Sequence, residues 1–162
     1  MKAIIFFIAI VLSSQWCYGQ LTEKVIGVNE NGTYKITANL SELQSILEGQ
    51  LKTEGNPTSL YKMEIRKDIT EGVGGQEYYI IAGQNKIGNI KIAVDVELKG
   101  NTFIAKYSKA NGTFSSFATC FGGCIKGCNP KKWIDSSGNI FWECTDCPGR
   151  SEACKKSVTI NL

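Results

Sequence analysis

The sequence contains no histidine among its 162 residues. Without an imidazole, the chain cannot build a Ser-His-Asp or Cys-His nucleophile system, an HExxH zinc site or a histidine pH switch. Basic and acidic side chains are nearly balanced, 18 against 15, which excludes an acidic disordered tail and a basic arm for nucleic acid. No remaining motif indicates a particular reaction. We therefore expect a protein that is not an enzyme, with no catalytic residue, no cofactor, no metal site and no nucleic-acid partner.

Long apolar runs are also scarce, and the longest one covers residues 3–12. A membrane-spanning helix needs roughly 20 apolar residues, whereas the apolar core of a secretory signal is typically about 7–15 residues long. We expect residues 1–19 to be a signal peptide cleaved near Gly19, and the protein to be secreted, extracellular or periplasmic, without a membrane span. Lipid attachment at Cys17 is disfavoured because such cysteines usually follow small residues, unlike Trp16.

Cysteine is absent from most of the chain after the signal peptide, and the patterning there predicts an α+β domain over residues 20–110. The Asn31-Gly32 pair between two strand-like runs is a hairpin signal. A helix is expected next, with Asn39 or Ser41 as its N-terminal cap. Its apolar residues recur at spacings of three and four, which places them on one helical face. They are Leu40, Leu43, Ile46, Leu47 and Leu51.

After this helix the apolar period changes to two, which indicates strands. Shorter alternating runs include Tyr61, Met63 and Ile65, and also Phe103, Ala105 and Tyr107. The clearest run comprises Ile90, Ile92, Val94, Val96 and Leu98. We expect one helix packed on an antiparallel meander sheet that is covered on one side only. Asp95 and Glu97 share the other face, where we interpret them as solvated charges rather than a catalytic carboxylate pair.

The remaining six cysteines are concentrated near the C-terminus: Cys120, Cys124, Cys128, Cys144, Cys147 and Cys154. An even number of cysteines in an exported chain favours disulfides, and six cysteines allow 15 pairings, among which the sequence does not choose. Glycines and prolines leave this segment too little core to fold alone. We expect a disulfide-stapled cysteine-rich subdomain over residues 111–162, whose last strand, 157–162, returns to the sheet.

Two other uses of the cysteines compete with disulfides. Cys144 and Cys147 have the spacing of half a four-cysteine zinc site, but zinc would leave two cysteines unexplained. They also form a CxxC pair, as in thiol-disulfide redox proteins. Redox pairs normally lie at a helix N-terminus, whereas this pair follows a strand-like run, and the charge of Asp146 would raise the thiol pKa. A structural role is therefore favoured.

A second predicted hairpin carries the aromatic residues of this segment, with Ser136-Ser137-Gly138 as its turn. Basic side chains lie near its rings, so we take these residues as a candidate binding surface. The alternative is that at least two of the rings form the core of the stapled subdomain. The residues are Trp133, Phe141, Trp142, Lys131, Lys132 and Arg150.

These features favour a small exported binding protein without catalysis. An extracellular protein or peptide partner, including a peptidase, fits better than a glycan. The alternative function is a CxxC thiol-disulfide redox protein or a cysteine-based metal-binding protein. Asn31, Asn39 and Asn111 match the N-glycosylation acceptor pattern, and whether they are used depends on the host.

Overall fold

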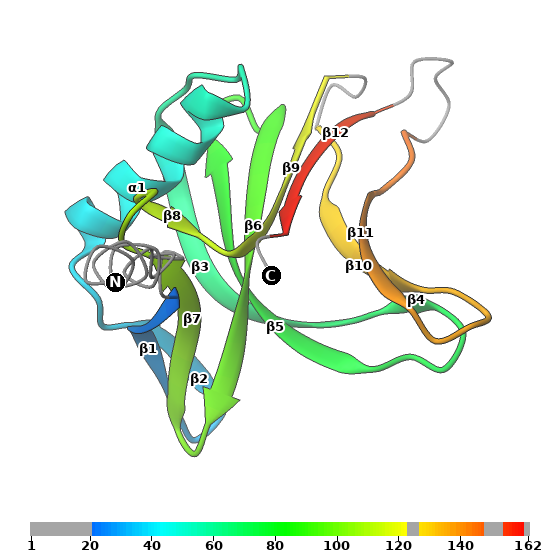
Figure 1. Cartoon of the computed structure of the whole chain (residues 1–162), viewed down its shortest axis with the longest axis horizontal. Coiled ribbons are helices and arrows are strands. Elements are labelled where there is room, and N and C mark those ends of the chain that lie inside the picture. The colour runs from blue at the N-terminus through cyan, green and yellow to red at the C-terminus, as the bar shows by residue number, and fades with distance from the viewer. Residues whose placement is uncertain (1–20, 123–126, 148–153, 161–162) are drawn as a thin grey trace, which may run out of the picture.

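The computed structural model describes residues 21–122, 127–147 and 154–160 (Figure 1). The expected signal peptide, Cys124 and Arg150 lie outside these residues. The described part of the chain holds one helix, α1 (Leu40–Thr53). Its strands in chain order are β1 (Leu21–Glu30), β2 (Thr33–Ile36), β3 (Leu60–Ile69), β4 (Glu71–Gly72), β5 (Glu77–Asn85), β6 (Ile90–Lys99), β7 (Thr102–Ser108), β8 (Thr113–Phe114), β9 (Ser116–Phe121), β10 (Pro130–Ile134), β11 (Ile140–Cys144) and β12 (Lys155–Ile160).

Strands dominate the molecule more than the sequence predicts, although the α+β class broadly holds. Nine strands form one sheet, in which β12, β9, β6, β7, β1 and β2 are neighbours in that order, while β5 pairs with β6 and β3, and β8 with β7. The first half of β6 pairs with both β5 and β9, and its last three residues pair with β7. The sheet curves into a half-barrel, with α1 at the left of Figure 1.

Local signals in the sequence explain the first hairpin and the helix. Asn31 and Gly32 have φ angles of 52° and 87°, the left-handed conformation that a two-residue hairpin turn requires. The Asn39 side chain accepts a 3.0 Å hydrogen bond from the Glu42 N–H and so caps α1. The predicted hairpin and cap are therefore confirmed.

The expected apolar face of α1 is confirmed in its centre and wrong at its start. Leu43, Leu47 and Leu51 are fully buried, whereas Leu40 is 54% exposed. Leu40 is the first residue of α1 and is absent from the core that the other leucines form. The buried leucines pack against one face of the large sheet in a first core that includes Ile26, Ile65, Ile81, Ile92, Val94, Phe103, Phe114 and Phe117.

The expectation of a sheet covered on one side only is wrong. Ile80, Ala93 and Ala118 are fully buried on the face opposite α1, because side chains alternate along a strand. They form a second core with Tyr78 and Trp142. The small side chains of Ala93 and Ala118 leave room for another layer to approach closely.

That layer is a three-stranded sheet in the order β11, β10, β4, which we call the hairpin layer. β10 and β11 form the predicted hairpin, and β4 pairs with β10 in parallel. Strands β9 and β12 connect this part of the chain to the large sheet, since β12 pairs with β9 and β9 with β6. Whether residues 111–162 count as a separate subdomain stays a prediction.

Two disulfides join these parts. Cys120 in β9 is bonded to Cys144 at the end of β11, so one bridge links the large sheet to the hairpin layer. Cys128, before β10, is bonded to Cys154, before β12. The predicted disulfides are therefore confirmed for these four cysteines. Among the described residues, no helix combines the length and apolarity that crossing a membrane requires.

Candidate functional site

The β10–β11 hairpin presents two different faces. Residues directly opposite each other in an antiparallel pair project to the same side. Trp142 lies opposite Lys132 and is only 3% exposed, so this pair faces the large sheet. Trp133 lies opposite Phe141 and is 38% exposed, so that pair faces outward. The two tryptophans of the candidate surface therefore have opposite environments.

The inner face is locked onto the sheet by Trp142. Its indole N–H donates a 3.3 Å hydrogen bond to the Ser116 hydroxyl. Its ring meets the Tyr78 ring edge to face, with centroids 6.4 Å apart. Trp142 thus belongs to the second core. For this residue, the alternative interpretation of the aromatic rings, as core residues and not as a binding surface, applies.

Lys132 also holds the inner face of the hairpin against the large sheet. Its ammonium lies 5.3 Å from the centroids of both the Tyr78 and Trp142 rings and 2.6 Å from an Asp95 carboxylate oxygen. Its backbone N–H donates a 3.0 Å hydrogen bond to the Tyr78 hydroxyl. Burial raises the pKa of Tyr78 above its usual value, so the phenol stays neutral. The Lys132 ammonium therefore interacts with groups of this protein instead of with a binding partner.

The outer face carries the exposed apolar side chains of this region. Trp133 and Phe141 form a cross-strand aromatic pair. Ile69 and Val73, exposed to 57% and 62%, flank β4, which pairs with β10 at Trp133. Exposed apolar residues gathered on one surface are a feature of protein contact sites.

A hollow of about 320 Å³ opens on the outer face beside these rings. Its charged lining includes Lys131, which pairs with Glu71, and Glu143, whose carboxylate lies 2.9 Å from the Lys156 ammonium. Asp146 also lines it and forms no ion pair with any residue that the structure describes. Four of the six residues in the candidate surface thus line one hollow, together with acidic groups: Lys131, Lys132, Trp133 and Phe141.

A larger cleft of about 710 Å³ lies between β5, β6, β7 and β1. Four carboxylates line it, and a lysine lies within ion-pair distance of each one. The pairs are Glu23 with Lys99, Glu77 with Lys67, Asp95 with Lys132, and Glu97 with Lys99 at 3.8 Å. Asp95 and Glu97 are thus engaged in ion pairs at the protein surface.

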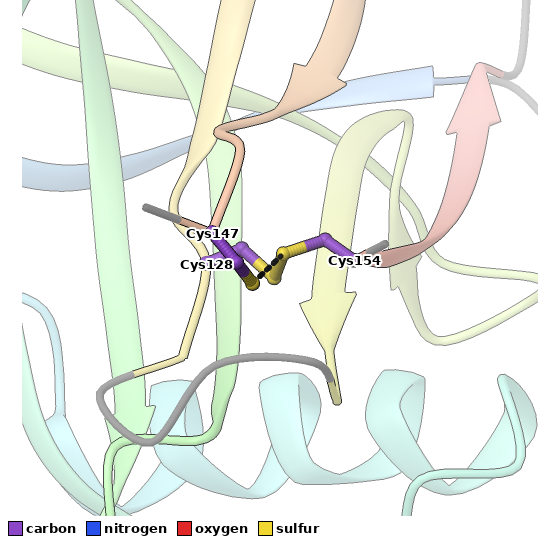
Figure 2. A group of neighbouring side chains, drawn as sticks. All are labelled: Cys128, Cys147 and Cys154. Atoms are coloured by element: carbon purple, nitrogen blue, oxygen red, sulfur yellow. Dashed lines mark hydrogen bonds between the residues drawn. A yellow bond between two sulfur atoms is a disulfide. The ribbon is translucent and has the colours of Figure 1, made fainter. Parts of the chain in front are cut away.

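The sulfur atoms of Cys128, Cys147 and Cys154 lie within 4.8 Å of one another (Figure 2). Cys128 and Cys154 are bonded to each other, and the Cys147 sulfur is 3.4 Å from that of Cys154. Metal ions bind thiolates, which these sulfurs do not offer while the disulfide is intact. Cys147 is itself disulfide-bonded, and Cys144 is joined to Cys120, so the CxxC pair does not form its own disulfide.

Sequence reasoning misses the contribution of the segment around β4. The candidate surface predicted from the sequence does not include Ile69, and the pair Gly74-Gly75 indicates only a turn. A signal is nevertheless present, because Val73 is an apolar residue isolated between glycines. No alternating strand pattern accounts for an apolar residue at this place, so it is a candidate for a surface contact.

No family model, no curated protein and no solved structure matches the chain.

Proposed function

We propose that this protein is a small exported binding protein without catalytic activity, which holds an extracellular protein or peptide on the outer face of its hairpin layer. The observation that carries this proposal is the exposed Trp133–Phe141 pair, on a hairpin whose opposite face is locked by Trp142. An anchored strand pair presents its side chains with little loss of conformational entropy on binding. Exposed tryptophans on such rigid supports are typical binding hot spots.

The chemistry around Trp133 favours a protein or peptide over a glycan. Ile69 and Val73 extend the aromatic pair with aliphatic side chains. Aliphatic groups bury apolar surface well but offer no hydrogen bonds to the hydroxyls of a sugar ring. An apolar centre with charged groups at its margin is the usual composition of a protein interface.

Two features support export. Disulfides join Cys120 to Cys144 and Cys128 to Cys154, and disulfides persist mainly in oxidising compartments outside the cytoplasm. The apolar run at residues 3–12 has the length of a signal-peptide core.

The absence of catalysis is supported by how the candidate groups are used. The carboxylates of the larger cleft are engaged in ion pairs with lysines. Redox and metal-binding functions are weaker candidates, because all five cysteines that the structure describes are disulfide-bonded.

The proposal is tested by partner retention. Extracellular fluid from the source organism is passed over immobilised protein, and any retained protein is purified and titrated against the wild type and Trp133→Ala. We expect Trp133→Ala to raise the dissociation constant at least about 30-fold, as for a hot-spot residue. Thermal unfolding of the variant confirms that it remains folded.

Tyr61→Ala is the matched control. Tyr61 is also an exposed aromatic residue, 73% accessible, but it lies at the start of β3, whereas β4 follows the end of that strand. Its loss should leave the dissociation constant unchanged. A partner that binds Trp133→Ala as tightly as wild type, or the absence of any retained protein, would contradict the proposal.

A further inference from the structure

We infer that the hollow on the outer face of the hairpin layer binds one basic side chain of the partner, and that arginine suits it best. This inference rests on the proposed function and adds the chemistry of the partner residue. It is carried by three properties of the hollow: aromatic walls, an excess of negative charge and a volume suited to a single side chain.

The aromatic walls are Trp133 and Phe141, which lie directly opposite each other across β10 and β11. The face of an aromatic ring attracts a cation through its quadrupole, and tryptophan does so most strongly. The hairpin already shows this preference on its inner side, where the Lys132 ammonium lies near the Trp142 and Tyr78 rings. On the outer side, no cation of the described residues lies over the Trp133 ring.

One carboxylate that lines the hollow has no ion-pair partner among the described residues. Glu71 is neutralised by Lys131, and Glu143 by Lys156. Lys132 also reaches the lining, but its ammonium is paired with Asp95 on the inner face. Asp146 is therefore the unmatched charge, and it favours a cationic guest.

Hydrogen bonds hold the residue that precedes Asp146. Its neighbour Thr145 donates its N–H to the Asn129 carbonyl at 3.0 Å and accepts the Asn129 N–H on its hydroxyl at 2.9 Å. These bonds extend the β10–β11 pairing beyond Cys144, which is held by its disulfide to Cys120. The unmatched carboxylate thus follows a rigid segment instead of a free loop.

The volume and the mixed lining favour arginine. About 320 Å³ lies at the lower end of the range for small-molecule sites, about 300–1,000 Å³, which suits one side chain and not a larger ligand. A planar guanidinium can stack on an indole and at the same time donate hydrogen bonds to carboxylates. The ammonium group of a lysine also donates hydrogen bonds to carboxylates but stacks less well on an aromatic ring.

The test uses the amide of N-acetylarginine as its probe and the amide of N-acetylcitrulline as the neutral isostere. Each is titrated into the full chain while the Trp133 indole N–H resonance is followed by NMR. We expect a saturable shift with the arginine compound, at a dissociation constant of about 1 mM for a ligand of this size. The citrulline compound should bind at least about fivefold more weakly.

Asp146→Asn removes the unmatched charge and should weaken arginine binding about fivefold. Glu30→Gln is the control, because it changes the net charge equally in the β1–β2 hairpin, on the other side of the molecule from the hairpin layer (Figure 1). Equal binding of the two compounds, or equal weakening by both variants, would overturn the inference. If partner retention still depends on Trp133 in that case, the proposed function stands without it.

Discussion

Single residues determine how closely β4 approaches the outer face. Gly72 in β4 has a φ of 89°, and a Cβ atom at this position would overlap the Ile134 carbonyl oxygen and lie 2.8 Å from the Trp133 indole nitrogen. The backbone of β4 therefore packs directly against the edge of the indole. This contact holds Trp133 in the position that the proposed site requires.

Replacing Gly72 by alanine should therefore destabilise the protein and displace the Trp133 ring. The left-handed backbone alone costs an alanine about 1–2 kcal/mol, and the steric overlap should add about 1–3 kcal/mol. Denaturant unfolding measures the total, and the shift of Trp133 fluorescence reports the displacement.

Gly74→Ala separates these two causes. Gly74 has a similar φ of 83°, but a methyl group added there would meet no atom within 4 Å apart from its chain neighbours. This variant should show only the backbone cost and leave the Trp133 fluorescence unchanged. Equal destabilisation by the two alanine variants would show that the close approach of Gly72 is unimportant.

At the scale of elements, the turn between β10 and β11 is held by one side chain. The Asp135 carboxylate accepts hydrogen bonds from the backbone N–H groups of Ser137 and Asn139, at 2.8 and 2.9 Å, and from the Asn139 amide at 3.0 Å. The Asn139 side-chain bond contributes most to lowering the pKa of Asp135 below its ordinary value. These bonds favour the ionised carboxylate.

The stabilising effect of Asp135 should therefore depend on pH. Because its pKa is lower in the folded state, its contribution is fully present above the unfolded value of about 3.9 and is lost as the pH falls through the folded value. We expect Asp135→Ala to lower the melting temperature at pH 7, and the difference from wild type to shrink below about pH 4. A difference that is unchanged or larger at low pH would show that the charged form is not the one stabilised.

The elements differ in how far the sequence predicts them. The helix cap at Asn39 and the turn at Asn31-Gly32 follow from interactions within a few residues, and both are confirmed. The short strand β4 could not be predicted, because it is defined by pairing with β10, far along the chain. Its glycines are as typical of an ordinary turn as of a close approach between strands.

At the scale of the molecule, the disulfides and the second core bind the cysteine-rich part of the chain to the large sheet. Cys120–Cys144 and Cys128–Cys154 close loops of similar length, with sequence separations of 24 and 26. Only the first directly links a strand of the large sheet to a strand of the hairpin layer. The two bridges should therefore differ in their local effect and resemble each other in their global effect.

The double variant Cys120→Ala/Cys144→Ala should lose about 2–4 kcal/mol of unfolding free energy, and so should Cys128→Ala/Cys154→Ala. Only the first should also expose Trp142, because β11 then loses its covalent link to β9. Unfolding curves and hydrogen exchange of the Trp142 indole N–H measure the two effects. Equal exposure of Trp142 in both variants would contradict the role given to the first bridge.

The overall assembly lies beyond sequence-based prediction for a physical reason. Fifteen disulfide pairings are compatible with the cysteine count, and only the folded chain brings Cys120 to Cys144. Likewise, Ala93 is unremarkable on a mostly polar strand face until β10 and β11 cover it. The candidate surface is predicted as a set of residues, but its division between Trp142 inside and Trp133 outside depends on the register of β10 against β11.

The central claim is that one hairpin buries Trp142 and presents Trp133 to a partner. Acrylamide quenching of tryptophan fluorescence tests it in the chain from Gln20 onward, where these are the only tryptophans. Trp142→Phe leaves Trp133 as the reporter, and Trp133→Phe leaves Trp142. We predict a quenching constant several-fold larger for Trp133 than for Trp142. Equal constants, or a larger one for Trp142, would contradict the account.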